Sequence, residues 1–276
     1  FPENPILVYR PFHLNERNYL YLADRGRIYG DVRLFDDQGT GIHFYTNRED
    51  TIADQEMTVE LSRIDLKQFK KVLPYLPDVE GWLGGSLHYV DSEGQMMLSA
   101  DMNLDNFVYE KSPLGNWTMS GAYLPGDNNA HHVDGFITYN DQEIIYMNGV
   151  YQADETGQEN ITGELELQHF PLQVINPFIP EKMVAFTGDI DGTLSMTGSP
   201  MKPVLNGGLQ LDSVLMIMPD MSVGFRFDNK QVKMQDSKMV FDKFNIYTRG
   251  ETPFVVNGSV DFSDLEKMMV DLRMKT

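Results

Sequence analysis

The sequence predicts a mainly β protein, an elongated antiparallel sheet built from repeats with two short amphipathic helices. Three observations carry this prediction. Apolar and polar residues alternate along most of the chain, clusters of turn residues separate the alternating segments, and one order of segments occurs twice. Alternation with a period of two is typical of strands that bury one face.

The alternating segments place apolar side chains on one side of each expected strand. Turn signals such as Asp36–Gly39 and Asp91–Gly94 recur about every 10 to 20 residues, as antiparallel hairpins require. Near the C-terminal end, the alternation changes face around Gly258. The clearest alternating series are Met96, Leu98, Ala100, Met102 and Leu104; Ile161, Gly163, Leu165 and Leu167; and Val223, Phe225 and Phe227.

Two segments have a helical period, "IDLKQFKKVLPYLP" and "FPLQVINPFIP", and each is expected to form about three turns. Each carries one apolar stripe. This stripe favours a lid packed on the sheet, and the alternative is a helix that gates an apolar groove. The stripes are Leu66, Phe69, Leu73 and Leu76 in the first segment and Leu172, Ile175, Phe178 and Ile179 in the second.

These segments belong to a repeat. Pro74–Pro77 matches Pro177–Pro180 as Pro-aromatic-aliphatic-Pro, and Gly85-Ser86-Leu87 matches Gly192-Thr193-Leu194. The offset between partners is about 103 to 107 residues. An array of this kind buries its apolar faces by stacking neighbouring units.

The domain organisation predicted from this repeat is one continuous β-rich segment over 1–276, interpreted as a fragment of a longer chain. The repeat cores cover about 57–125 and 161–230. Residues 252–276 are expected to begin a third copy.

Composition excludes several classes of function. Asp and Glu number 41 against 22 Lys and Arg, a net charge of −19, so phosphate backbones and anionic membrane surfaces are repelled. The absence of cysteine excludes disulfides, thiolate metal sites and cysteine nucleophiles. No apolar run approaches the roughly 20 residues of a membrane helix.

Motifs for catalysis and for metal binding are weak. There is no nucleophile elbow, phosphate loop or zinc helix. His131 and His132 are adjacent, so on a strand they point to opposite faces and are poorly placed to share one ion. Asp189 and Asp191 resemble part of a calcium loop but lack its third ligand and distal Glu, and the polar side of a strand explains them better. The prediction is a protein that is not an enzyme, with no cofactor and no metal.

A family resemblance adds to this interpretation. The helix ending "NPFIP" and the following pattern from Gly188 to Leu211 resemble the C-terminal region of the TamB family, the translocation and assembly module proteins related to AsmA. The run "LSMTGSPMKPVLNGGLQL" is its most specific part, and "VEGWLGGSLHYV" is similar to a diverged copy of the same module. The resemblance is strong over about 160–275 and weaker over 28–160.

The resemblance implies a long sheet curled lengthwise into a taco-like groove, apolar inside and polar outside. Family members are anchored in the inner membrane of Gram-negative bacteria and extend through the periplasm. They contact outer-membrane assembly proteins of the Omp85 type, and they are similar to proteins in which phospholipid acyl chains move along a groove. The two helical insertions, the 17 Met residues and the lack of an identifiable anchor or docking segment depart from the family pattern.

A groove of this kind would be lined by bulk apolar side chains, with no single one essential. A strand of about seven residues spans roughly 23 Å, comparable to an extended acyl chain, and flexible Met side chains suit a featureless ligand. Alternation alone is equally compatible with an apolar face that closes into the core of a β-sandwich and excludes water. The family resemblance favours the open groove. The predicted lining residues are Leu87, Met96, Leu98, Met102, Leu104, Leu165, Leu167, Leu194, Met196, Leu209, Leu211, Phe225 and Phe227.

The function predicted from these observations is that of a non-enzymatic periplasmic segment. It would bind or conduct acyl chains, assist outer-membrane protein assembly, or both. The alternative is a carbohydrate-binding or hydrolytic cell-envelope β-protein that uses Trp82, Trp117 or surface tyrosines as stacking platforms.

Overall fold

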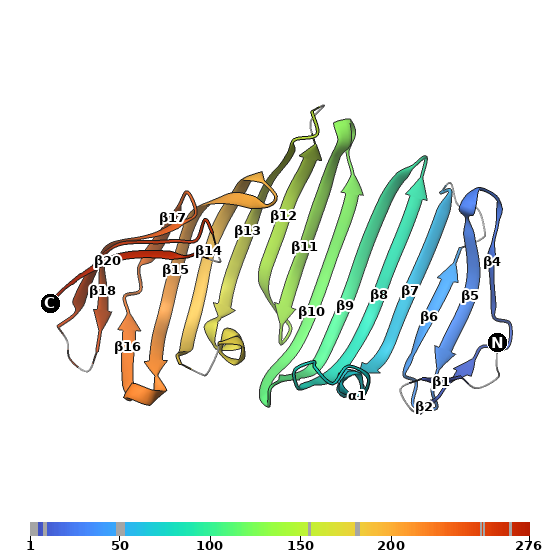
Figure 1. Ribbon diagram of the computed structural model, residues 1–276, viewed down its shortest axis with the longest axis horizontal. Coiled ribbons are helices and arrows are strands. Elements are labelled where there is room, and N and C mark those ends of the chain that lie inside the picture. Colours follow the sequence, from blue (N-terminus) through green and yellow to red (C-terminus); the bar gives the residue numbers. More distant parts are fainter. Residues whose placement is uncertain are drawn as a thin grey trace. The chain divides into compact units, whose positions relative to one another are not determined.

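The computed structural model describes residues 5–7, 10–47, 53–153, 156–179, 183–248, 250, 252–264 and 267–276. The chain is mainly β, with long antiparallel strands and two short helical segments (Figure 1). The predicted fold class is therefore confirmed at this level. The strands follow one another along the chain, and most of the described strands pair with their neighbours in sequence.

The chain divides into two compact units, and each is described by itself. Unit 1 comprises residues 1–127 and 132–142, and unit 2 comprises residues 128–131 and 143–276. The boundary falls between the two repeat cores that the sequence predicts.

Unit 1 contains an antiparallel sheet in which each strand pairs with the next, from β5 to β10. Strands β3 and β4 both pair with β5, and β1 and β2 form a small ribbon. The strands are β1 (Ile6–Leu7), β2 (Arg10–Pro11), β3 (His13–Leu14), β4 (Tyr19–Leu22), β5 (Ile28–Phe35), β6 (Gly41–Thr46), β7 (Gln55–Asp65), β8 (Val79–Ser92), β9 (Gln95–Tyr109), β10 (Ser112–Pro125) and β11 (Ala130–Tyr139).

In unit 2 the ladder runs from β12 to β15 and then divides. Strands β16 and β17 pair with different parts of β15, and both pair with β18, which continues the ladder to β19 and β20. The strands are β12 (Gln142–Ala153), β13 (Glu159–Pro171), β14 (Ala185–Ser199), β15 (Lys202–Met218), β16 (Val223–Phe227), β17 (Gln231–Gln235), β18 (Lys238–Tyr247), β19 (Phe254–Asp261) and β20 (Met269–Lys275).

The two predicted helices exist but are shorter than three turns. The first is a 3₁₀ turn, η2 (Leu66–Gln68), followed by α1 (Phe69–Val72), and the second is the 3₁₀ helix η4 (Leu172–Phe178). Proline explains the difference, because it lacks a backbone N–H and disfavours the helical conformation of the residue before it. Pro74 follows α1 closely, and Pro177 lies inside η4. Other short turns are η1 (Asp24–Gly26), η3 (Asp127–Asn129) and η6 (Pro219–Met221).

Backbone irregularities recur at the offset of the sequence repeat. Gly85 and Gly192 both have positive φ, 133° and 152°, and a Cβ atom at either position would lie about 2.1 to 2.2 Å from a carbonyl oxygen of the next strand. Arg63 and His169, at the preceding bulges, have φ of 48° and 46°. The matched positions of the two repeats thus share the same positive-φ backbone conformation. Pro180, the last residue of the matched Pro motif, lies outside the described residues.

A carboxamide or carboxylate from the adjacent strand, or from a turn beside it, satisfies the N–H of several bulge residues. Asn106 N donates to Asn116 Oδ1 at 2.8 Å, Ser213 N to Asn229 Oδ1 at 3.0 Å, and His169 N to Asp191 Oδ1 at 2.8 Å. Such bulges leave a ladder donor unpaired, so this bond stabilises the irregularity.

The buried core is concentrated in unit 2. Leu172, Leu211, Val214, Phe244 and Val256 belong to one cluster of buried side chains there, and a smaller cluster forms around Leu194 and Leu209. The chain exposes 17968 Å², whereas two separate compact domains of half its mass would expose about 14,600 Å². This excess agrees with sheet area that is covered on one side only.

Candidate functional site

The sheet of unit 1 has one apolar face, and strand register defines it. Residues directly opposite each other in an antiparallel pair point to the same side. Leu87 lies opposite Val59 on β7 and Ala100 on β9. We call this side of the sheet the apolar face. Its members include Val32, Leu34, Ile42, Phe44, Met57, Val59, Leu61, Leu83, Leu87, Tyr89, Met96, Leu98, Ala100, Met102, Leu104, Trp117 and Met119.

The opposite face of the same sheet is polar. The register row Glu60–Ser86–Asp101–Ser120 crosses four strands on this side. His88 bonds Thr58 through Nδ1 at 2.9 Å. The predicted alternation therefore separates apolar and polar side chains onto two faces.

Unit 2 shows the same separation. Leu165 lies opposite Met147 and Leu194, and Leu211 lies opposite Ile190. Thr162, Glu164 and Glu166 alternate with these residues on the other face of β13. The remaining predicted residues share the apolar face: Leu167 with Ile145, Met196 with Leu205, Leu209 with Val232, Phe225 with Met216, and Phe227 with Ile246.

The predicted lining residues differ in exposure between the two units. Leu87 and Met96 in unit 1 are 40% and 44% exposed, whereas Leu194, Leu209 and Leu211 in unit 2 are at most 9% exposed. The three leucines are buried because β17, β18 and the helix η4 contribute side chains that pack against them. Unit 1 has no comparable cover: among its described apolar side chains, Phe12 and Leu114 alone are buried.

The helix η4 lies on the apolar face of unit 2. Leu172 belongs to the buried cluster around Phe244, and Ile175 packs against the same cluster. Asn176 fixes the helix to β14, because its Nδ2 donates to Phe186 O at 2.8 Å and its Oδ1 accepts from Phe186 N at 2.7 Å. This helix is therefore part of the core, as the lid interpretation expects.

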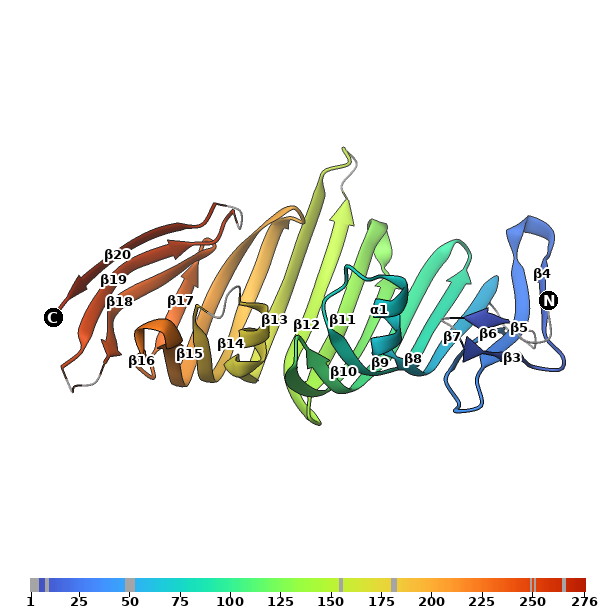
Figure 2. The same cartoon turned by 60° about the horizontal axis from the view of Figure 1, so that its bottom comes forward.

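The first helical segment of the sequence lies on one face of the sheet of unit 1 (Figure 2). Phe69 of α1 and Phe12 line a cavity of about 170 Å³ with the apolar-face residues Leu34 and Ile42 and with Ile64 of β7. The segment covers a part of the apolar face near β5 to β7 and leaves the central residues such as Leu87 exposed.

Ion pairs hold this segment to β8 and the turn before it. Lys67 Nζ lies 2.6 Å from Glu80 Oε1, and this hydrogen bond raises the pKa of Lys67. Lys70 bonds Asp78, and that bond lowers the pKa of the Asp78 carboxyl. The raised pKa keeps Lys67 charged at neutral pH, and the lowered pKa does the same for Asp78.

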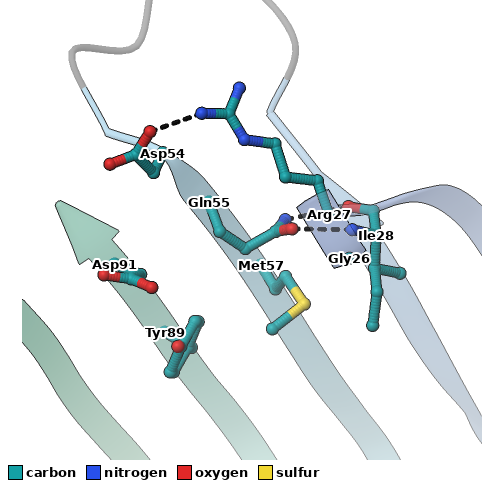
Figure 3. A pocket seen from close by; sticks show the side chains of 8 residues that line it. All are labelled: Gly26, Arg27, Ile28, Asp54, Gln55, Met57, Tyr89 and Asp91. Atoms are coloured by element: carbon teal, nitrogen blue, oxygen red, sulfur yellow. Dashed lines mark hydrogen bonds and ion pairs between the residues drawn. The ribbon is translucent and has the colours of Figure 1, made fainter. Parts of the chain in front are cut away.

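A pocket of about 440 Å³ lies at the rim of the apolar face, where β5, β7 and β8 approach one another beyond the end of β6 (Figure 3). Gln55 bridges β7 to β5, since its Oε1 accepts from Ile28 N at 2.7 Å and its Nε2 donates to Ile28 O at 2.8 Å. Arg27 forms an ion pair with Asp54. Met57, Tyr89 and Asp91 complete the lining.

Sequence reasoning missed this pocket. Asp91 stands at the start of a turn signal and was assigned to it, but it continues the alternation of Leu87 and Tyr89 on β8. Asp91 is a polar residue at a position where the alternation of β8 predicts an apolar one, and this departure could have indicated the pocket. Met119 and Ile42, both exposed on the apolar face, were missed as well, because their own segments alternate less regularly.

The polar candidates form no metal centre. Among the residues that the structure describes, no three metal-ligating side chains come together. His169 Nδ1 lies 2.9 Å from Asp191 Oδ1, while Asp189 lies opposite Asp212 in the ladder. Asp189 and Asp191 thus contribute to the polar face of β14, and His169 lies at the bulge of β13.

The two tryptophans point to opposite faces of the unit 1 sheet. Trp117 lies opposite Leu104 on the apolar face, and Trp82 lies opposite Asp105, one position along β9. Trp117 packs beside Tyr139 with 4.9 Å between ring centroids, and the Arg63 guanidinium lies 5.3 Å from the Trp82 ring. They cannot form one stacking platform, so they give no support to a shared carbohydrate site.

Comparison with family models, with curated proteins and with solved structures gives no match to this chain. Within the described part of the chain, no helix has the length and apolar character that crossing a membrane requires.

Proposed function

We propose that this chain is a non-enzymatic segment of a TamB-like protein of the cell envelope, and that its apolar face binds or conducts the acyl chains of lipids. The observation that carries this proposal is the uncovered apolar face of unit 1. There Leu87, Met96, Met119 and Ile42 are each 40% exposed or more. Exposed apolar side chains that gather on one face of a protein mark an interaction surface.

The chemistry of this face suits a hydrocarbon chain. The register row Met119–Met102–Gly85–Leu61 contains only apolar residues across four strands. Methionine adapts its shape to a mobile apolar ligand, and no charged side chain interrupts this row. Removing such surface from water contributes about 25 cal/mol per Å².

The proposed location and partners rest on the family resemblance. We place the segment in the periplasm of a Gram-negative bacterium, with the full-length protein anchored in the inner membrane. Its partners would be phospholipid or other acyl chains and an Omp85-type outer-membrane assembly protein, and it would also assist outer-membrane protein assembly. The charge of −19 disfavours nucleic acid.

Native mass spectrometry tests the proposal. The protein is purified without detergent, and its mass is compared with that of the protein after extraction by organic solvent. We expect adducts with the masses of phospholipids, and phospholipid in the extract. A protein that carries no lipid, takes up none from vesicles of phosphatidylethanolamine and phosphatidylglycerol, and binds glycans instead would contradict the proposal.

A further inference from the structure

The rim pocket of unit 1 joins the apolar face to a set of charged groups. Met57 and Tyr89 lie opposite each other in the ladder, and Asp91 lies two residues beyond Tyr89 on the same side of β8. Figure 3 shows Asp91 and Tyr89 on one strand, Met57 and Gln55 on the next, and Arg27 across from them. The charged groups of the pocket therefore lie at the ends of the strands, and Met57 and Tyr89 lie farther inside the sheet.

Asp91 carries a buried carboxylate oxygen without a partner. Its Oδ1 is shielded from solvent and accepts no hydrogen bond. Buried polar atoms in folded proteins are nearly always paired, and an unpaired carboxylate oxygen is costly. A cationic ligand in the pocket that Asp91 lines would compensate the charge of this carboxylate.

The sign of the charge selects the donor. Arg27 is already paired with Asp54, whose Oδ2 also accepts from Glu93 N at 3.0 Å. Asp91 therefore leaves the pocket with an excess negative charge, in a chain whose net charge is −19. A cationic group fits this field, and the Tyr89 ring adds a face on which an ammonium group can rest.

An apolar column leads away from Asp91 along β8. Tyr89, Leu87 and Leu83 lie on the same face, and the eight residue steps from Asp91 to Leu83 span about 26 Å at 3.3 Å per step. One leaflet of a bilayer core is about 15 Å thick. The column is thus long enough for an acyl chain whose polar end lies in the pocket.

We infer that the rim pocket is a headgroup site for a zwitterionic phospholipid with a primary ammonium group, such as phosphatidylethanolamine. The ammonium group lies at the Asp91 carboxylate beside Tyr89, and the acyl chains follow the column of Tyr89 and Leu87. This inference rests on the proposed function and adds the headgroup class to it.

The test compares lipids with identical acyl chains. The protein is incubated with vesicles of equal parts phosphatidylethanolamine and phosphatidylglycerol, and the bound lipids are quantified by mass spectrometry. We expect the protein to prefer phosphatidylethanolamine about tenfold. Asp91→Asn, which keeps the side-chain shape, should lose this preference while the total lipid bound is unchanged. Asp91→Glu should restore part of it. The control Asp101→Asn removes an exposed carboxylate from the polar face of the next strand and should keep the full preference.

The outcomes separate the headgroup site from the proposed function. Lipid uptake without headgroup preference, or a preference that survives in Asp91→Asn, would overturn the headgroup site and leave acyl-chain binding intact. No lipid uptake at all would overturn both. Free phosphoethanolamine, which has no acyl chain, should compete weakly at millimolar concentration. Displacement of phosphatidylethanolamine by an equal concentration of it would show a site for a soluble amine and would overturn the lipid assignment.

Discussion

Replacing Leu87 by glutamate is expected to reduce lipid binding at least tenfold while the fold is retained. Leu87 lies at the centre of the apolar face of unit 1, with Val59 and Ala100 as its cross-strand neighbours. It is 40% exposed, so a carboxylate there can reach water in the free protein. A bound acyl chain would cover that carboxylate, and the cost of burying it without a partner is several kcal/mol. Lipid uptake from vesicles, with far-ultraviolet circular dichroism as the check on folding, measures the effect.

The matched control is Ser99→Glu. Ser99 lies on β9 on the polar face, opposite His88 and Ala122. The same charge is added to the same sheet, and lipid uptake should remain within about twofold of that of the unchanged protein, since surface charges act weakly at this distance. An equal loss in both variants would mean that net charge, and not the apolar face, determines uptake.

Replacing Phe244 by alanine is expected to lower the free energy of unfolding of unit 2 by about 3–5 kcal/mol. Phe244 is 2% exposed and meets Phe227 and Phe241 edge-on, with 6.2 and 5.4 Å between ring centroids. Truncation leaves a cavity among side chains from η4, β15, β17, β18 and β19. Urea unfolding followed by far-ultraviolet circular dichroism measures the loss.

Leu87→Ala provides the comparison in unit 1. The side chain is already partly in water, so its truncation should cost less than about 1 kcal/mol. Equal losses for the two variants would contradict the view that unit 2 has a packed core while the central apolar face of unit 1 is uncovered.

Much of the fold follows from local sequence. The alternation of Met96, Leu98, Met102 and Leu104 places these residues on one face, because a strand can bury a series of period two on one side only. The repeat also predicts shared irregularities, since Gly85 and Gly192 both need a backbone conformation that glycine tolerates. These features depend on neighbouring residues along one or two strands.

Other features depend on contacts between distant segments and could not be predicted in this way. Leu194, Leu209 and Leu211 have the same pattern as Leu87 but are buried, because later strands and η4 pack against them. The two helices are shorter than the apolar stripes predict, because Pro74 and Pro177 interrupt the helical conformation that the stripes favour. Asp91 is polar and close to a turn, so its position at the rim of the apolar face emerges only when β5, β7 and β8 are brought together.

The most direct test of acyl-chain binding is a photo-crosslinking scan along β9. A photoreactive amino acid is placed singly at each position from 96 to 104 of the full-length protein in living cells, and lipid adducts are identified by mass spectrometry. We expect adducts with a period of two, at Met96, Leu98, Ala100, Met102 and Leu104, and none at Met97, Ser99, Asp101 or Asn103. Adducts at both sets, or at neither, would contradict the claim that the apolar face binds acyl chains.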